Sequence, residues 1–261
     1  MAWTTLAILI VLFFVTSVVG VVTGSNSLIT VPVMFQFGID EKVAVATNMF
    51  GLTFMAIGGT IPFVRAGQIE YRKLSPLVIL TVAGSAIGAA LVGMISNNGI
   101  KLIVSIAMIV IVVFTLVSGN KAESPALAGG IDEHKKSLSV GSTGSVFGFV
   151  VIFFLAIYGG LYSGGYVTIL TVAFVALFGM TYAVAIAATK FVNVFSSAIA
   201  TAIYMWQGLV DYKLGVILAV TMFIGAFVGA HFVTKMDEVW LKRIFLATVF
   251  VLAIKTLFDF L

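Results

Sequence analysis

The chain has 261 residues, of which 61% are hydrophobic and only 9% are charged, and its mean hydropathy is +1.22. This composition exceeds what a water-soluble core of this length needs, so we predict an all-α, polytopic integral membrane protein. The net charge of +4 does not indicate a nucleic-acid partner, because the basic residues lie in short connections between apolar runs, where they orient a protein in the bilayer.

Cysteine and histidine content argues against a metal site or cofactor. The chain has no cysteine, which excludes disulfides and thiolate ligands. Its two histidines, His134 and His231, are too few for a histidine metal site. We therefore expect no metal and no cofactor.

Apolar runs define the expected elements. A spanning helix needs roughly 20 apolar residues. Six runs meet this length, near 43–64, 74–96, 100–118, 182–206, 213–234 and 240–258.

Two further regions, 3–37 and 144–178, are too long for one helix, and each is interrupted by a glycine-rich polar segment, at 23–27 and 158–165. The pieces after the interruptions would rise only about 18 Å as helix, which is too short to cross. We expect each region to form a helix, a break and a half-length helix, making a re-entrant element.

The two halves of the chain resemble each other at an offset of 141 positions. Glycines, aromatics and small residues coincide without a gap from Gly38, which meets Gly179, to Ala89, which meets Ala230. A duplicated hydrophobic unit interrupted at the same place in each copy is typical of secondary transporters with a site at the repeat interface. We divide the chain into a first repeat (1–119), a linker (120–143) and a second repeat (144–261), with four hydrophobic segments in each repeat.

The orientation of the repeats depends on whether the two broken regions cross the membrane. If they are re-entrant, the copies are inverted, and nine basic residues on one face oppose four on the other. The nine are Arg65, Arg72, Lys73, Lys121, Lys135, Lys136, Lys235, Lys242 and Arg243, and the four are Lys42, Lys101, Lys213 and Lys255. If they cross fully, the split is eight against five. The positive-inside rule thus favours inverted repeats with both termini outside.

The two breaks are the first candidate binding site. Each break leaves backbone N–H groups unpaired at the start of the half-helix, and that helix end carries a partial positive charge. Two such ends meeting at mid-bilayer would hold a small anion. The candidates are Ser25, Asn26, Ser27 and Thr30 in the first repeat and Gly164, Gly165, Tyr166, Thr168 and Thr171 in the second. The alternative is that these small residues only allow close helix packing.

Lys190 is the second candidate, as the one Lys or Arg well inside an apolar span. A charge within lipid is unfavourable by about 2.5–3.5 kcal/mol, so its side chain should face protein or a water-filled cavity. The polar stripe on its helix and the equivalent positions in the first repeat add Thr189, Asn193, Ser197, Thr47 and Asn48. The alternative is a lysine that reaches the membrane interface.

These features resemble the TauE/SafE family, also described as sulfite exporters or probable membrane transporter proteins. The resemblance rests on the apolar run from the first break to Pro32 and Gly38, on Ala46-Thr47, and on Ala188-Thr189-Lys190 with Asn193. Lys190 follows Thr189 directly, whereas one branch of the family has an A-T-x-K-x-x-N-like pattern. The resemblance covers nearly the whole chain and implies movement of sulfite, sulfoacetate or other organosulfonates across the cytoplasmic membrane, often outward.

The predicted function is a secondary transporter that holds a small anion between two broken helices and works by alternating access. Its expected partners are that anion and the lipid bilayer, and the coupling ion, H⁺ or Na⁺, stays open. No HExxH, GxSxG, P-loop or GxGxxG motif occurs, so an enzyme is not predicted. The alternatives are a passive anion channel and a non-transporting membrane assembly protein.

Overall fold

The computed structural model describes residues 3–24, 26–107, 146–236 and 240, and in this part of the chain all regular structure is helical. The helices are α1 (Trp3–Thr23), α2 (Ser27–Gln36), α3 (Glu41–Arg65), α4 (Tyr71–Met94), α6 (Val146–Leu161), α7 (Tyr166–Phe178), α8 (Tyr182–Trp206) and α9 (Tyr212–Val233). Residues 97–107 are also helical. The linker 120–143, the end of the 100–118 run and nearly all of the 240–258 run lie outside the described residues.

Five helices, α1, α3, α4, α8 and α9, are long and apolar enough to cross a membrane. Three shorter apolar helices, α2, α6 and α7, belong to the two regions that were expected to be broken. The prediction of an all-α polytopic membrane protein is therefore confirmed.

The long helices begin and end with the same signals in both halves. Asp40 caps α3 by accepting hydrogen bonds from the N–H groups of Lys42 and Val43, and Thr181, at the equivalent position, caps α8. Gly67 and Gly208 follow the ends of α3 and α8 with φ values of +67° and +69°. Glycine adopts this left-handed conformation without a steric penalty, so both helices end at equivalent positions.

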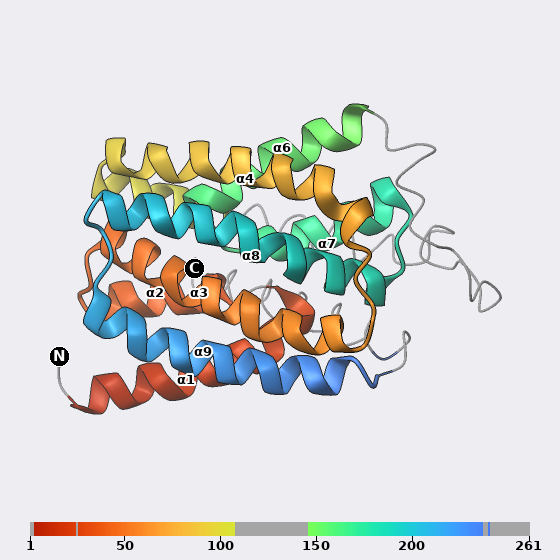
Figure 1. The fold of residues 1–261 in the computed structure, drawn as a ribbon. Helices are drawn as coiled ribbons and strands as arrows, with labels where there is room; N and C mark the ends of the chain where they lie inside the picture. Colours follow the sequence, from red (N-terminus) through yellow and green to blue (C-terminus); the bar gives the residue numbers. More distant parts are fainter. Residues whose placement is uncertain (1–2, 25, 108–145, 237–239, 241–261) are drawn as a thin grey trace.

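The eight labelled helices form a bundle in which equivalent helices run in opposite directions (Figure 1). In that view α1, α3 and α9 run from left to right, whereas α6, α8 and α4 run from right to left. The first arm of each broken region packs against a long helix of the other half, α1 against α9 and α6 against α4. These directions support inverted repeats, although the duplication itself stays a prediction.

Glycines allow these inter-half crossings to be close. A Cβ atom at Gly88 of α4 would lie 1.9 Å from the carbonyl oxygen of Ile157 in α6. At the equivalent Gly229 of α9 it would lie 2.3 Å from the carbonyl oxygen of Val18 in α1. Backbones therefore meet directly at both crossings, as small residues permit in membrane bundles.

Candidate functional site

Both predicted breaks are present. The chain leaves the helix between Thr23 and Ser27, and again between Leu161 and Tyr166. Gly24 and Gly165 have φ values of +69° and +72°, which break the helical path. Ser163 has a φ value of +59°, a conformation that serine rarely adopts and that often marks a functional site.

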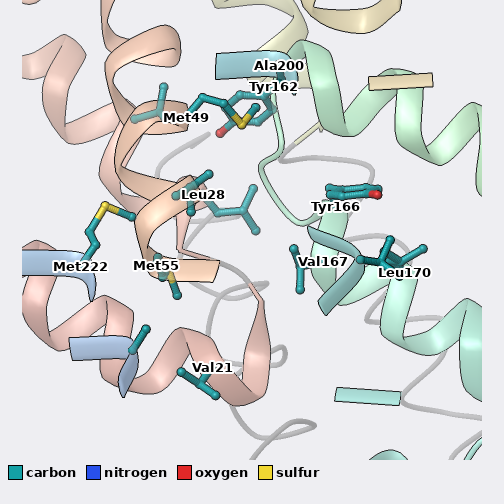
Figure 2. Packing of buried hydrophobic residues seen from close by; sticks show 14 of the residues in the cluster. Val21, Leu28, Met49, Met55, Tyr162, Tyr166, Val167, Leu170, Ala200 and Met222 are labelled. Carbon is teal, nitrogen blue, oxygen red and sulfur yellow. The ribbon is translucent and has the colours of Figure 1, made fainter. Parts of the chain in front are cut away.

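The two breaks hydrogen-bond to each other across the bundle. The Thr168 hydroxyl donates to the carbonyl oxygen of Thr23 at 2.5 Å, and the hydroxyl oxygens of Ser27 and Ser163 lie 3.0 Å apart. Each of these two contacts joins a residue at one break with a residue at the other. Figure 2 shows the start of α2, at Leu28, and the start of α7, at Val167, on facing sides of this junction.

Gly24 allows the junction to close. A Cβ atom at this position would lie 2.7 Å from Cγ1 of Val167 and 2.8 Å from the backbone nitrogen of Thr168. The first turn of α7 therefore rests directly on the backbone of the first break. The positive ends of two half-helices meet in the same small region of the bundle.

Each half-helix is also tied to the long helix that follows it. In the first half, the Asn48 side chain donates to the Ser27 hydroxyl at 2.9 Å and accepts from the Thr30 hydroxyl at 2.7 Å. In the second half, the hydroxyl oxygens of Thr171 and Thr189 lie 3.2 Å apart. All of these side chains are buried, so hydroxyl and amide groups concentrate around the breaks in an otherwise apolar interior.

Tyrosine hydroxyls donate hydrogen bonds to backbone carbonyl groups at both breaks. The Tyr204 hydroxyl donates to the carbonyl oxygens of Gly160 and Leu161 at 2.5 and 3.0 Å, and the Tyr162 hydroxyl donates to that of Ser27 at 3.2 Å. Tyr158 donates to the carbonyl oxygen of Gly164. Sequence reasoning did not name Tyr162, Ser163 or Thr23 as site residues, although all three lie within or beside the interruptions.

Lys190 of α8 points into the protein, beside the first break. Its side chain is 3% exposed, and its ammonium donates to the carbonyl oxygen of Gly20 at 2.8 Å. Gly20 lies in the last turn of α1, where the negative end of the helix favours a cation. Among the residues described, the only ion pairs are Lys73 with Glu70 and Lys101 with Glu41, so no carboxylate there compensates Lys190.

Asn26, the N-cap residue of α2, has a buried side-chain acceptor without a hydrogen-bond partner, and its side chain lies near Gly20. Its Nδ2 donates to the Ser17 hydroxyl at 3.3 Å, while its Oδ1 is buried without a hydrogen-bond partner. Cβ of Asn26 lies 3.5 Å from the position that a Cβ on Gly20 would occupy. The backbone around Gly20 thus has the Lys190 ammonium and the Asn26 amide as neighbours.

The structure brings most, but not all, of the predicted site residues to the breaks. Those at the junction or tied to it are Asn26, Ser27, Thr30, Asn48, Gly164, Gly165, Tyr166, Thr168, Thr171, Thr189 and Lys190. Ser25 lies outside the described residues.

Three predicted residues have contacts elsewhere. Thr47 accepts a hydrogen bond from the backbone N–H of Asp211 at 3.0 Å, at the start of α9. Asn193 and Ser197 bond within α8, where the Ser197 hydroxyl donates to the Asn193 carbonyl oxygen at 2.5 Å. Whether any of the predicted residues contacts a substrate stays a prediction.

Comparison with known proteins gives the family. Residues 8–256 match the family described as "Sulfite exporter TauE/SafE". The chain belongs to this family. A "Probable membrane transporter protein ORF9" from Sinorhizobium sp. is 26% identical over 99% of this chain and 95% of its own length. A "Probable membrane transporter protein" from Haemophilus influenzae is 26% identical over 97% of this chain and 95% of its own length.

A further relative, "Probable membrane transporter protein YfcA" from Escherichia coli K12, is 25% identical over 95% of this chain and 89% of its own length. No solved structure matches the chain. The family, these relatives and the apolar helices indicate a membrane transporter.

Proposed function

We propose that this transporter carries small sulfur-containing anions such as sulfite, sulfoacetate or other organosulfonates out across the cytoplasmic membrane. The anion binds between the starts of α2 and α7, and one half of the bundle rocks against the other to expose it to each side in turn. The family description supports sulfite as a substrate, and the residues around the breaks support an anion.

The observation that carries the proposal is that Lys190 is buried and has no carboxylate partner among the described residues. An ammonium buried without a counter-ion is strongly unfavourable, and in a membrane protein it marks a functional site. The described acidic residues, Asp40, Glu41, Glu70 and Asp211, all stand at helix starts and not beside it. A bound anion would supply the missing negative charge.

The half-helices give the anion its hydrogen-bond donors. The first backbone N–H groups of a helix have no partner within that helix, and their dipoles favour an anion. Ser27 and Thr168, each in the first turn of its half-helix, add hydroxyls. The oxygen atoms of a sulfite or sulfonate group accept several such bonds at once, without a second buried cation.

The junction has to loosen for an anion to enter. Its closing bonds, from Thr168 to Thr23 and between Ser27 and Ser163, are made by hydroxyls that can donate to an anion instead. Entry therefore exchanges protein–protein hydrogen bonds for protein–anion hydrogen bonds. Such an exchange keeps the energetic difference between the empty and the loaded state small, which a carrier requires.

Proteoliposome flux tests the proposal. We expect purified protein to exchange labelled sulfite or an organosulfonate against the same unlabelled anion, with saturation. Lys190→Ala should lower this exchange about 30-fold or more, because removing a buried charge from a bound pair costs about 2 kcal/mol or more. Lys213→Ala is the matched control, since Lys213 is an exposed lysine at the start of α9.

Each outcome is decisive. Undiminished exchange by a folded Lys190→Ala variant would remove Lys190 from the site. Ohmic conductance without counter-transport would replace the carrier with the channel alternative. Absence of flux for sulfite, sulfonates, sulfate and carboxylates would leave the assembly-protein alternative.

A further inference from the structure

A groove of about 280 Å³ lies between α3 and α8, and none of the residues that line it belongs to the breaks. Its walls are α3 residues from Ile57 to Arg65 and α8 residues from Phe191 to Phe195. Thr60 is the one uncharged polar residue in the lining, and its hydroxyl is bonded to the carbonyl oxygen of Ala56 in its own helix. Apart from Arg65 at its end, the groove is apolar and therefore suits a hydrocarbon chain.

The position of the groove points to lipid as its occupant. Both walls are helices that meet the criteria for membrane spans, and the lining residues Val64 and Phe195 are 40% and 41% exposed. In a bilayer, apolar side chains exposed on spanning helices contact acyl chains. A groove between two such helices is filled by one of these chains.

Arg65 supplies the polar end of this site. It is the last residue of α3, it is exposed, and it forms no ion pair among the described residues. The nearest acidic residue along the chain, Glu70, is paired with Lys73 at 2.6 Å. A guanidinium at the membrane interface binds a phosphate group through two parallel hydrogen bonds, so a phosphate is the complementary partner.

We propose that this groove binds an anionic phospholipid, with one acyl chain between α3 and α8 and the headgroup phosphate on Arg65. Arg65 lies on the membrane face that the sequence predicts to be positive and cytoplasmic, and that leaflet attracts basic groups through its anionic lipids. At the equivalent position of the other half stands Trp206, which is 88% exposed and uncharged. The equivalent position in the other half therefore lacks the cation on which the proposed site depends.

The bound lipid would act on the contact between the two halves. Thr53 of α3 and Thr201 of α8 share a hydrogen bond of 2.9 Å, so these helices link the halves directly. Phe191 and Val194, which line the groove, are the immediate neighbours of Lys190 and Asn193 in α8. An acyl chain in the groove stabilises the packing of α3 against α8 seen here.

Lipid retention and thermal stability test the site without any transport assay, so failure here is distinguishable from failure of the proposed function. Delipidated protein in neutral detergent is given phosphatidylglycerol or phosphatidylcholine with identical acyl chains. Retained lipid is counted by native mass spectrometry, and the Tm is measured with each lipid. Wild type should prefer phosphatidylglycerol, and the exposed-lysine control Lys213→Gln should keep that preference.

Two variants distinguish the contact with the lipid headgroup from the contact with the acyl chain. Arg65→Gln should lower the preference for phosphatidylglycerol about fivefold, which corresponds to one interfacial cation. Val194→Trp should lower retention of both lipids, because the indole fills the groove. Arg65 is exposed at a helix end, so its variant decides the question even if Val194→Trp does not accumulate. An unchanged preference in Arg65→Gln, or equal stabilisation of wild type by soluble glycerol 3-phosphate, would overturn the proposal.

Discussion

At the scale of the residue, Gly24 shows how one position meets two constraints at once. Its φ of +69° favours glycine, and the start of α7 occupies the space where a side chain would begin. Gly38, after the end of α2, has a φ of +76° but no atom within 4 Å of its Cβ position. A comparison of substitutions at Gly24 and Gly38 therefore separates the cost of backbone strain from the cost of steric overlap.

We expect Gly24→Ala to destabilise the protein more than Gly38→Ala. Strain at positive φ costs about 1–2 kcal/mol in both variants. Gly24→Ala adds about 1–3 kcal/mol of overpacking against Val167 and Thr168. Denaturant unfolding in detergent measures both free energies of unfolding. Equal losses would show that the close approach at Gly24 does not exist in solution.

At the scale of the element, each broken region is stabilised by partners outside itself. A half-helix of 10 residues, such as α2, is too short to be stable alone, so its position depends on α3 and on the second break. The hydroxyl pair of Ser27 and Ser163 is one of the hydrogen bonds that join the two breaks, and both of its partners are side chains. Because Ser27 also binds Asn48, a single substitution there would mix two interactions.

A double-mutant cycle isolates this link. Ser27→Ala combined with Ser163→Ala should show a coupling energy of about 0.5–1.5 kcal/mol, the usual net value of a hydrogen bond. Ser27→Ala combined with Thr221→Ala is the control, because Thr221 bonds within α9 to Ile217 and should be additive. Additivity in the first cycle would mean that the two breaks are not held together by this pair.

At the scale of the whole molecule, helices of each half pack against helices of the other half. The first helix of each broken region packs against a long helix of the other half, α1 against α9 and α6 against α4, and α3 contacts α8. The rings repeat this arrangement, since Phe50 meets Tyr212 edge to face at 6.4 Å and Phe191 meets Tyr71 at 5.3 Å. Movement of one half against the other would therefore involve equivalent surfaces on both sides of the membrane.

Single cysteines test the inverted arrangement, and the absence of native cysteine makes each variant directly interpretable. Arg72 and Lys213 occupy equivalent positions at the starts of α4 and α9, and both are exposed. An impermeant maleimide added to sealed, oriented vesicles should label Arg72→Cys and Lys213→Cys from opposite sides. Lys235→Cys, an exposed position after α9, should label from the same side as Arg72→Cys. Labelling of positions 72 and 213 from one side would contradict the inversion.

The sequence by itself determined the membrane class, the long helices and both breaks. These features are local: hydropathy selects segments that lipid accepts, and clustered glycines interrupt a helix wherever the fold places it. The half-helices were predictable for the same reason, because their length alone shows that they do not cross. The burial of Lys190 also followed from the cost of a charge in lipid.

Only the tertiary structure decided which polar groups meet. The Lys190 ammonium binds the carbonyl oxygen of Gly20, 170 positions earlier in the chain, and Thr47 contacts the start of α9 instead of the breaks. These pairings depend on how each helix is rotated about its axis and on where it crosses its neighbours. In a membrane bundle both the buried and the lipid-facing sides of a helix are apolar. The hydrophobic pattern of the sequence therefore says little about how each helix is rotated, and close packing at glycines determines that rotation.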